Sequence, residues 1–195
     1  IGLSLVGSEM CIRDSILREH KISALLVTHD PEEAMFMSDK IGVLNNGCIE
    51  QFGSPIDLYL RPKSAFIAEF FGEINILEGT VQEGFVSTVL GTFNCSQRFN
   101  NKKVKIVVRD EAIKLFSANN INLNTKDNTN FIKSSYYGFV MEARLLAGSS
   151  LVHLSLKVDK LNFHIHAKIP GLNFFKVGEK VIVETDPTQI FIFEQ

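Results

Sequence analysis

The 195-residue sequence has little of several features that mark specialised classes of protein. Its three cysteines, Cys11, Cys48 and Cys95, are far apart and form no C-x-x-C pair. That spacing argues against a disulfide framework or a structural zinc site, and it is typical of a reducing compartment. The longest mostly apolar runs are about ten residues, too short to span a bilayer. The formal net charge is only −2, which argues against a nucleic-acid-binding protein.

What is present is the composition of a folded protein, with 45% hydrophobic and 22% charged residues. The length suits one ordinary domain or two small ones. The chain begins with Ile rather than Met, and Leu3–Ser15 (LSLVGSEMCIRDS) resembles a translated sequencing-adapter string. We therefore expect residues 1–15 to be a non-native tail and assign no function to them.

The first region has an α/β pattern. Ile16–His20 is typical of the end of a helix, and the apolar run Ala24–Thr28 predicts a parallel strand that is buried on both faces. Asp30 and Pro31 then predict a helix start, as N-cap and first helical residue. His29 is therefore expected at the tip of a buried strand, where ligands bind in open α/β sheets.

A hairpin and two short helices are expected next. Ile41–Leu44 and Cys48–Phe52 flank Asn45–Gly47, and Asn-Gly favours a type I′ turn. Ser54–Asp57 predicts one helix start, and Ser64–Phe71 predicts a second helix that ends at a glycine. The phenylalanines of this last helix are expected in the core: Phe66, Phe70 and Phe71.

The pattern changes from helical to extended near Gly72. Many short strands separated by turns predict a small barrel or sandwich, with a loop at Asn119–Asn130. The expected strands are Ile74–Val81, Phe85–Leu90, Val104–Arg109, Phe131–Val140, Met141–Leu146, Leu151–Lys157, Phe163–Ile169, Lys180–Glu184 and Ile190–Phe193.

The segment Ala24–Ala34 (ALLVTHDPEEA) closely resembles the switch-histidine segment of the ATP-binding subunits of ABC transporters. Ile49–Pro55 (IEQFGSP) agrees with the import-type subfamily, which serves maltose, polyamines, sulfate, thiamine and ferric iron. Phe70–Asn75 (FFGEIN) is similar to the ferric-iron and polyamine members. Val107–Glu111 resembles their V-R-P-E segment, with aspartate replacing proline, and Phe175–Val181 resembles their C-terminal TOBE module.

The resemblance implies an α/β fragment, the end of a P-loop nucleotide-binding domain, at residues 16–72. An all-β, OB-like TOBE barrel with a regulatory role would follow at residues 73–195. In such transporters two ATPase subunits enclose ATP and Mg²⁺, and the matching residue His29 would be the catalytic histidine that contacts the γ-phosphate. Ferric iron is the first expectation for the imported solute, and polyamine is the second.

The remaining ATPase motifs do not occur in the sequence. It contains no G-x-x-x-x-G-K-[ST] phosphate loop and no LSGGQ signature, and the strand ending in Asp-Glu is missing before Ile16. We therefore expect the chain itself neither to bind ATP tightly nor to hydrolyse it. The intact parent would be an ATP-hydrolysing translocase.

The family also implies partners and a location. These are a second ATPase subunit in a homodimer, transmembrane permease subunits and, indirectly, a periplasmic solute-binding protein, with no nucleic acid. The subunit would lie in the cytoplasm, on the inner face of the plasma membrane.

Other interpretations of the residues stay open. His164 and His166 share one strand face, and His153 is a candidate third metal ligand, but an exposed face without a metal is the favoured interpretation. A second hypothesis is a stand-alone module whose barrel binds a small anion or metal. A third, a hydrolase that uses His29 with Asp30 or Glu33, is disfavoured because adjacent strand residues point to opposite faces.

Overall fold

The computed structural model describes residues 15–17, 19–117, 136–158 and 161–195. The chain divides into two compact units, residues 1–71 and residues 72–195, which are described separately below. The expected tail, up to residue 14, and the expected loop Asn119–Asn130 lie outside the described residues. So do residues 131–135 of one expected strand.

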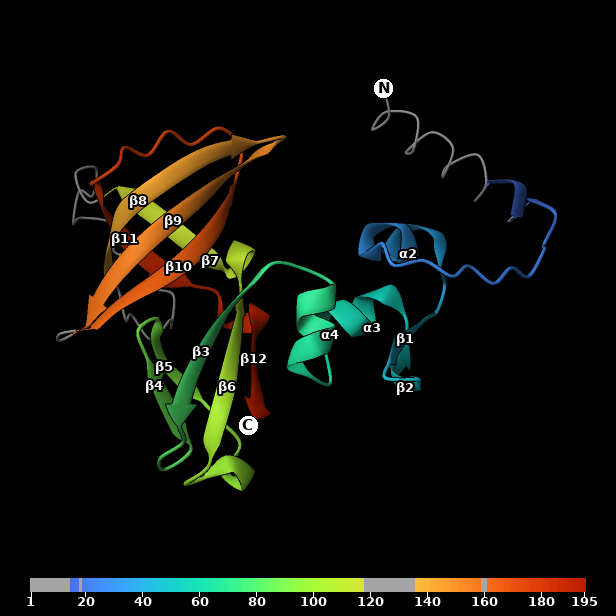
Figure 1. The fold of residues 1–195 in the computed structure, drawn as a ribbon, viewed down its shortest axis with the longest axis horizontal. Helices are drawn as coiled ribbons and strands as arrows, with labels where there is room; N and C mark the ends of the chain where they lie inside the picture. The colour runs from blue at the N-terminus through green and yellow to red at the C-terminus, as the bar shows by residue number, and fades with distance from the viewer. Residues whose placement is uncertain (1–14, 18, 118–135, 159–160) are drawn as a thin grey trace, which may run out of the picture. The chain divides into compact units, whose positions relative to one another are not determined.

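The first unit contains a capped helix and a hairpin (Figure 1). Helix α2 (Pro31–Met37) begins where it was predicted to begin, because the Asp30 carboxylate accepts hydrogen bonds from the first-turn N–H groups. Strands β1 (Ile41–Asn45) and β2 (Cys48–Gly53) pair antiparallel. The two residues between them, Asn46 and Gly47, have φ values of 49° and 79°. A type I′ turn requires positive φ at both positions, so the predicted hairpin is confirmed.

Two helices complete this unit, α3 (Pro55–Leu60) and α4 (Ala65–Phe70), with Ser54 and Ser64 as their N-caps. The expectation for the phenylalanines is only partly correct: Phe71 is buried, Phe70 is half-buried and Phe66 is 38% exposed. Ile67 and Ala68 are fully buried in α4, and Ile67 lies one turn before the buried Phe71 on the inner face. The small core consists of Ala34, Ile41, Val43, Leu58, Ile67 and Phe71.

The predicted strand Ala24–Thr28 is wrong for the described residues. Its backbone has no regular structure, and Leu25 and Val27 are 92% and 87% exposed. A parallel strand needs hydrogen-bonded neighbours and a covering layer on each face. Among the described strands every pairing is antiparallel, and none involves this run.

The second unit is built of strands in three described sheets (Figure 1). Their orders are β10-β9-β8-β11-β7, β12-β6-β3 and β4-β5. The strands are β3 (Ile74–Thr80), β4 (Phe85–Thr88), β5 (Gly91–Asn94), β6 (Lys103–Arg109), β7 (Ile113–Ser117), β8 (Tyr136–Leu146), β9 (Ser149–Val158), β10 (Leu161–Pro170), β11 (Lys180–Thr185) and β12 (Ile190–Glu194). The short 3₁₀ helix η2 (Asp110–Ala112) follows β6.

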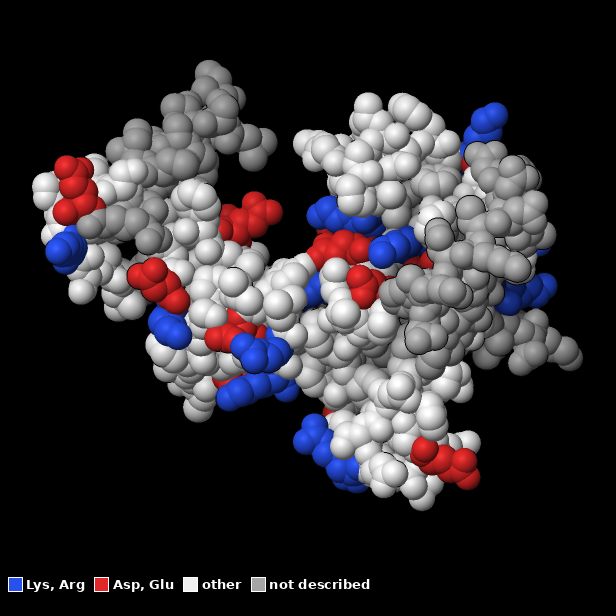
Figure 2. All heavy atoms as spheres, turned by 180° about the vertical axis from the view of Figure 1, so that it is seen from behind, with Lys and Arg blue, Asp and Glu red and all other residues white. Residues whose placement is uncertain are grey.

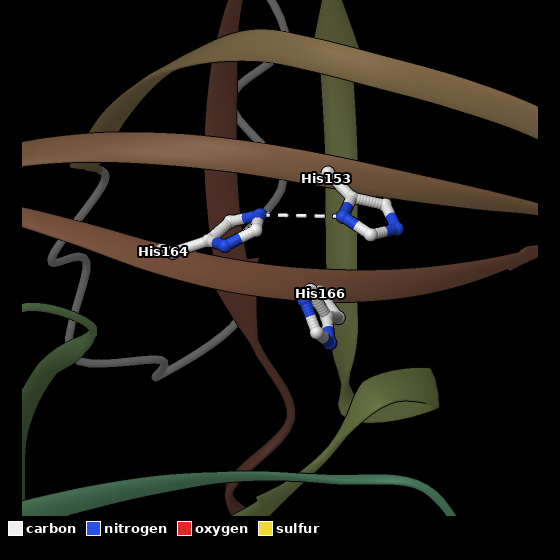
Figure 3. Close-up of side chains that lie close together, drawn as sticks. All are labelled: His153, His164 and His166. Atoms are coloured by element: carbon white, nitrogen blue, oxygen red, sulfur yellow. Dashed lines mark hydrogen bonds between the residues drawn. The ribbon is translucent and has the colours of Figure 1, made fainter.

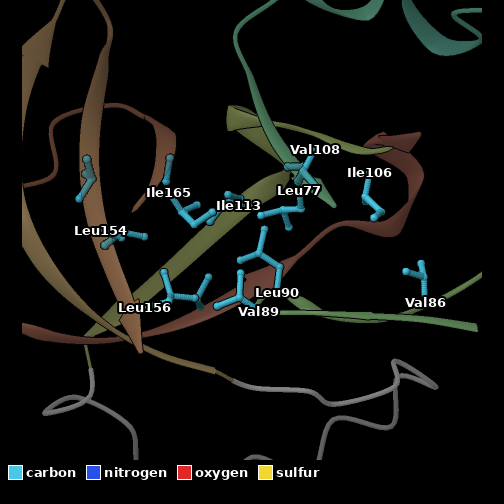
Figure 4. Close-up of a cluster of buried hydrophobic side chains, with 14 of the residues drawn as sticks. Leu77, Val86, Val89, Leu90, Ile106, Val108, Ile113, Leu154, Leu156 and Ile165 are labelled. Carbon is cyan, nitrogen blue, oxygen red and sulfur yellow. The ribbon is translucent and has the colours of Figure 1, made fainter. Parts of the chain in front are cut away.

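One core joins these sheets inside the unit (Figure 4). Leu154 and Leu156 of β9 and Ile165 of β10 belong to the same buried cluster as Leu77 and Ile106 of the three-stranded sheet. Inward residues alternate with outward ones along β9 and β10, as the strand period of two requires, whereas β6 is buried over residues 106–109. Each fully buried Leu or Ile side chain contributes about 1.5–3 kcal/mol to folding.

The strand prediction has three errors in this unit. Phe85–Leu90 is not one strand, because the chain turns after β4 and returns as β5 from Gly91, whose φ is 132°. The predicted boundary between Val140 and Met141 is a register shift inside the single strand β8. Strands β5 and β7 were not predicted.

Charged side chains of both signs lie interspersed on the face of the described residues that Figure 2 shows. This distribution agrees with the net charge of −2.

Substitution of Gly79 tests the packing between β3 and β4. An alanine Cβ at this position would lie 2.5 Å from Val86 Cγ2, which is fully buried. We expect Gly79→Ala to lower the free energy of unfolding by about 1–3 kcal/mol through overpacking, measured by urea denaturation. In the control Gly42→Ala, the new Cβ would lie 3.4 Å from Phe52 Cδ2, and it should have a much smaller effect. Equal stability of the two variants would contradict this packing.

Candidate functional site

His29 lies immediately before the N-cap of α2, and its side chain is exposed. The turn around it is fixed by hydrogen bonds, since Asp30 N donates to Thr28 Oγ1 over 3.1 Å. Asp30 Oδ1 accepts from the N–H groups of Glu32 and Glu33 over 2.8 and 3.2 Å. The imidazole therefore stands on an ordered turn and is accessible from solvent.

The hydrogen bonds of Asp30 argue against the His29–Asp30 pair of the hydrolase hypothesis. The Asp30 carboxylate caps the helix, so it is already engaged by backbone donors rather than oriented toward the His29 ring. A general-base pair needs a hydrogen bond between its members. The position before a helix start remains suitable for an imidazole that contacts a ligand.

A second group of side chains lies in the other unit. In the antiparallel pairing of β9 and β10, His166 is directly opposite His153, and His164 is two positions further along the same face. Directly opposite side chains have Cβ atoms about 4.5–5.5 Å apart. Leu154, which follows His153, and Ile165, which separates His164 from His166, point into the core.

The three imidazoles converge (Figure 3). His153 Nδ1 and His164 Nε2 are 3.2 Å apart and share a hydrogen bond, one ring N–H donating to the other nitrogen. The ring centroid of His166 lies 4.5 Å from the ring centroid of His153 and 4.9 Å from that of His164. One nitrogen of each ring falls within 4.8 Å of the others. The sequence favoured a strand face without a metal, yet the structure brings all three candidate ligands together.

An amide behind the cluster positions His166. Asn75 on β3 is buried, its Nδ2 donates to the His166 carbonyl oxygen, and its Oδ1 accepts from the His166 N–H, both over 2.8 Å. The same Nδ2 donates to Asp110 Oδ1 over 2.8 Å. The sequence did not predict a structural role for Asn75 or Asp110. The contacts of Asn75 reach residues 35 and 91 positions further along the chain, and no local pattern predicts contacts over such separations.

Burial shapes the electrostatics of the cluster. It lowers the pKa of His166, the neighbouring imidazoles of His153 and His164 lower it further, and Glu73 raises it. A lowered pKa favours the neutral ring, which is the form that binds metal ions.

Asp110 and its neighbour Arg109 are two buried ionisable residues of the same unit. Burial and the nearby Glu73 raise the pKa of Asp110 to about 7, against a smaller opposing effect of Lys168. Burial lowers the pKa of Arg109 to about 10, so its guanidinium stays charged near neutral pH, and it lies 5.6 Å from the Phe191 ring centroid. Residue 72 is a glycine, and a Cβ atom at this position would collide with Arg109 Nη1.

Comparison with known proteins confirms the resemblance to importer ATP-binding subunits. The chain is 32% identical over 93% of its length to the spermidine/putrescine import ATP-binding protein PotA of Acetivibrio thermocellus, and 39% identical over 77% to that of Desulfitobacterium hafniense. It is 32% identical over 92% to the Borreliella afzelii protein of the same name. The chain is thus related to the ATP-binding subunits of ABC importers.

The chain spans less than half the length of these relatives, 46–47% of each. Their names refer to polyamines, so the first expectation of ferric iron is not supported. No protein-family model matches the chain.

A solved structure, that of the cytoplasmic molybdate-binding protein ModG with molybdate bound, covers 62% of this chain and 96% of its own. The TM-score is 0.43 and the identity is 18%. Within the part of the chain that the structure describes, no helix is long and apolar enough to cross a membrane.

The buried Asp110 carboxyl predicts a pH dependence of stability. Its folded-state pKa of about 7 lies above the ordinary value of 3.8, so the folded state binds the proton more tightly, and stability falls as pH rises from about 4 to 7. Asp110→Asn keeps an acceptor oxygen but cannot ionise. We expect it to remove this decline and to stabilise the protein at pH 8 by up to about 4 kcal/mol.

Urea denaturation at pH 5 and pH 8 measures both effects. Glu83→Gln, which removes an exposed carboxylate from a turn, is the matched control and should leave the decline in place. The assignment is wrong if Asp110→Asn follows the same pH profile as the unsubstituted chain.

Proposed function

We propose that this chain is the C-terminal part of the ATP-hydrolysing subunit of a polyamine importer. The observation that supports this most strongly is the segment Ala24–Ala34, whose histidine directly precedes a capped helix, in a chain related to importer ATP-binding subunits on both sides of residue 72. The polyamine assignment rests on the names of the relatives.

The exposure of the run before His29 supports the same proposal. Leu25 and Val27 are almost fully exposed, although apolar runs of this kind normally form central parallel strands. In the parent protein, neighbouring strands of a nucleotide-binding domain would pair with this run and cover it. His29 would then lie at the carboxyl end of a sheet strand, where phosphate ligands bind.

ATP and Mg²⁺ would bind mainly to residues of the parent that this sequence does not contain, since it has no phosphate loop. When bound, ATP supplies the transferred phosphoryl group and Mg²⁺ neutralises its charge. The part of the mechanism that this chain provides is the His29 imidazole, whose N–H would donate to a γ-phosphate oxygen and stabilise the charge that develops there.

Residues 73–195 would serve as an OB-like TOBE domain that regulates the transporter or supports its dimer. The partners of the parent would be a second ATPase subunit, the permease subunits in the membrane and, through them, a solute-binding protein. The subunit would then act at the cytoplasmic face of the membrane. A stand-alone module is not favoured, because the relatives match both units of the chain rather than the second alone.

An ATPase assay tests this proposal. We expect the 195-residue chain alone to show no turnover. Fusion of residues 16–195 to the N-terminal half of the Acetivibrio thermocellus relative should restore Mg²⁺-dependent hydrolysis. His29→Ala in the fusion should lower kcat by about 10²–10³-fold, the usual effect of losing one transition-state hydrogen-bond donor.

The matched control is His20→Ala, which removes an exposed imidazole upstream of the motif and should leave kcat unchanged. Two results would contradict the assignment: hydrolysis by the chain alone, or full activity of the folded His29→Ala fusion.

A further inference from the structure

Three of the five histidines in the chain lie on the outer face of β9 and β10, where His164 and His166 follow His153 by 11 and 13 positions. His153 and His166 form a direct cross-strand pair, and His164 lies beside them on the same face. The opposite face of these strands packs into the core through Leu154 and Ile165. The backbone positions of all three ligands are thus fixed by the sheet and its core.

The spacing of the nitrogens suits one transition-metal ion. Two nitrogens bound tetrahedrally at about 2.0–2.1 Å lie about 3.3–3.4 Å apart. His153 Nδ1 and His164 Nε2 are already 3.2 Å apart, and the nearest nitrogen of His166 completes a set within 4.8 Å. The third nitrogen is therefore further from the other two than in a bound site, and binding requires the His166 ring to move by a change of its side-chain torsions.

The surroundings hold the backbone of the cluster and place two ion-paired carboxylates near it. The Asn75 amide holds the His166 backbone through two hydrogen bonds of 2.8 Å. Glu142 lies opposite His153 in the pairing of β8 with β9, where it also accepts from Arg144. Glu73 lies 4.0 Å from Lys168 and acts electrostatically on His166. Each carboxylate is paired with a cationic side chain, so the three imidazoles are the groups that would bind an ion.

We propose that His153, His164 and His166 form a binding site for a divalent transition-metal ion, with zinc as the first choice. Three imidazoles are a typical ligand set for zinc, and they leave a fourth position open to water or an exogenous ligand. His164 is exposed and the other two rings are half-buried, so an ion can enter from solvent. The site lies in the second unit and does not depend on the proposed ATPase function.

Isothermal titration with ZnCl₂ tests the site. The full 195-residue chain is purified without a polyhistidine tag, stripped of metal with a chelator and titrated at pH 7.5. We expect one zinc ion per chain and a higher Tm when zinc is present. His164→Ala should weaken binding at least about tenfold, as loss of a ligand does, and abolish the rise in Tm.

Controls separate the site from adventitious binding. His20→Ala removes one imidazole outside the cluster and should bind zinc as the unsubstituted chain does. Because His164 is exposed on the edge strand β10, its replacement should leave the far-UV circular dichroism unchanged. The proposal is overturned if folded chain binds no zinc at about 100 µM, an affinity weaker than about −5.5 kcal/mol, or if His164→Ala binds as tightly as His20→Ala.

Discussion

The antiparallel pairing of β9 with β10 determines which of their side chains face the core of the second unit and which lie on its outer surface. In this register Leu154 and Ile165 enter the core, while His153 and His166 meet outside it. A slip of one residue would exchange the two faces, burying imidazoles and exposing aliphatic side chains. The energetic demand of the core therefore determines where the histidines lie. The Asn75 amide strengthens the same register, because it bonds the backbone of the edge strand at one residue.

Local signals were sufficient for elements whose stability is local. The caps at Asp30 and Ser54 and the Asn46–Gly47 turn were predicted because their side chains or φ values act within three residues. Most strands of the second unit followed from alternation. The sequence could not predict that Asn75 joins Asp110 and His166, because those contacts arise only when separate sheets pack together. The histidine pattern was visible, but the convergence of the three rings depended on the register.

The failed prediction at Ala24–Thr28 has a physical reason of the same kind. An apolar run specifies a buried strand only where neighbours supply hydrogen bonds and cover, and the described residues supply neither. The proposal that a longer parent provides them accounts for both the exposure of Leu25 and the histidine motif that follows it. It also explains why the chain resembles an ATPase while lacking the residues that hold phosphate.

The most direct test of this account is a long sequencing read of the source DNA across the codon for Ile16. The account predicts that the upstream reading frame encodes a phosphate loop, an LSGGQ signature and a strand ending in Asp-Glu, in place of the adapter-like residues 1–15. An in-frame stop codon followed by a genuine start codon near Ile16 would contradict it, and the β unit with its histidine cluster would then be the functional part of the protein.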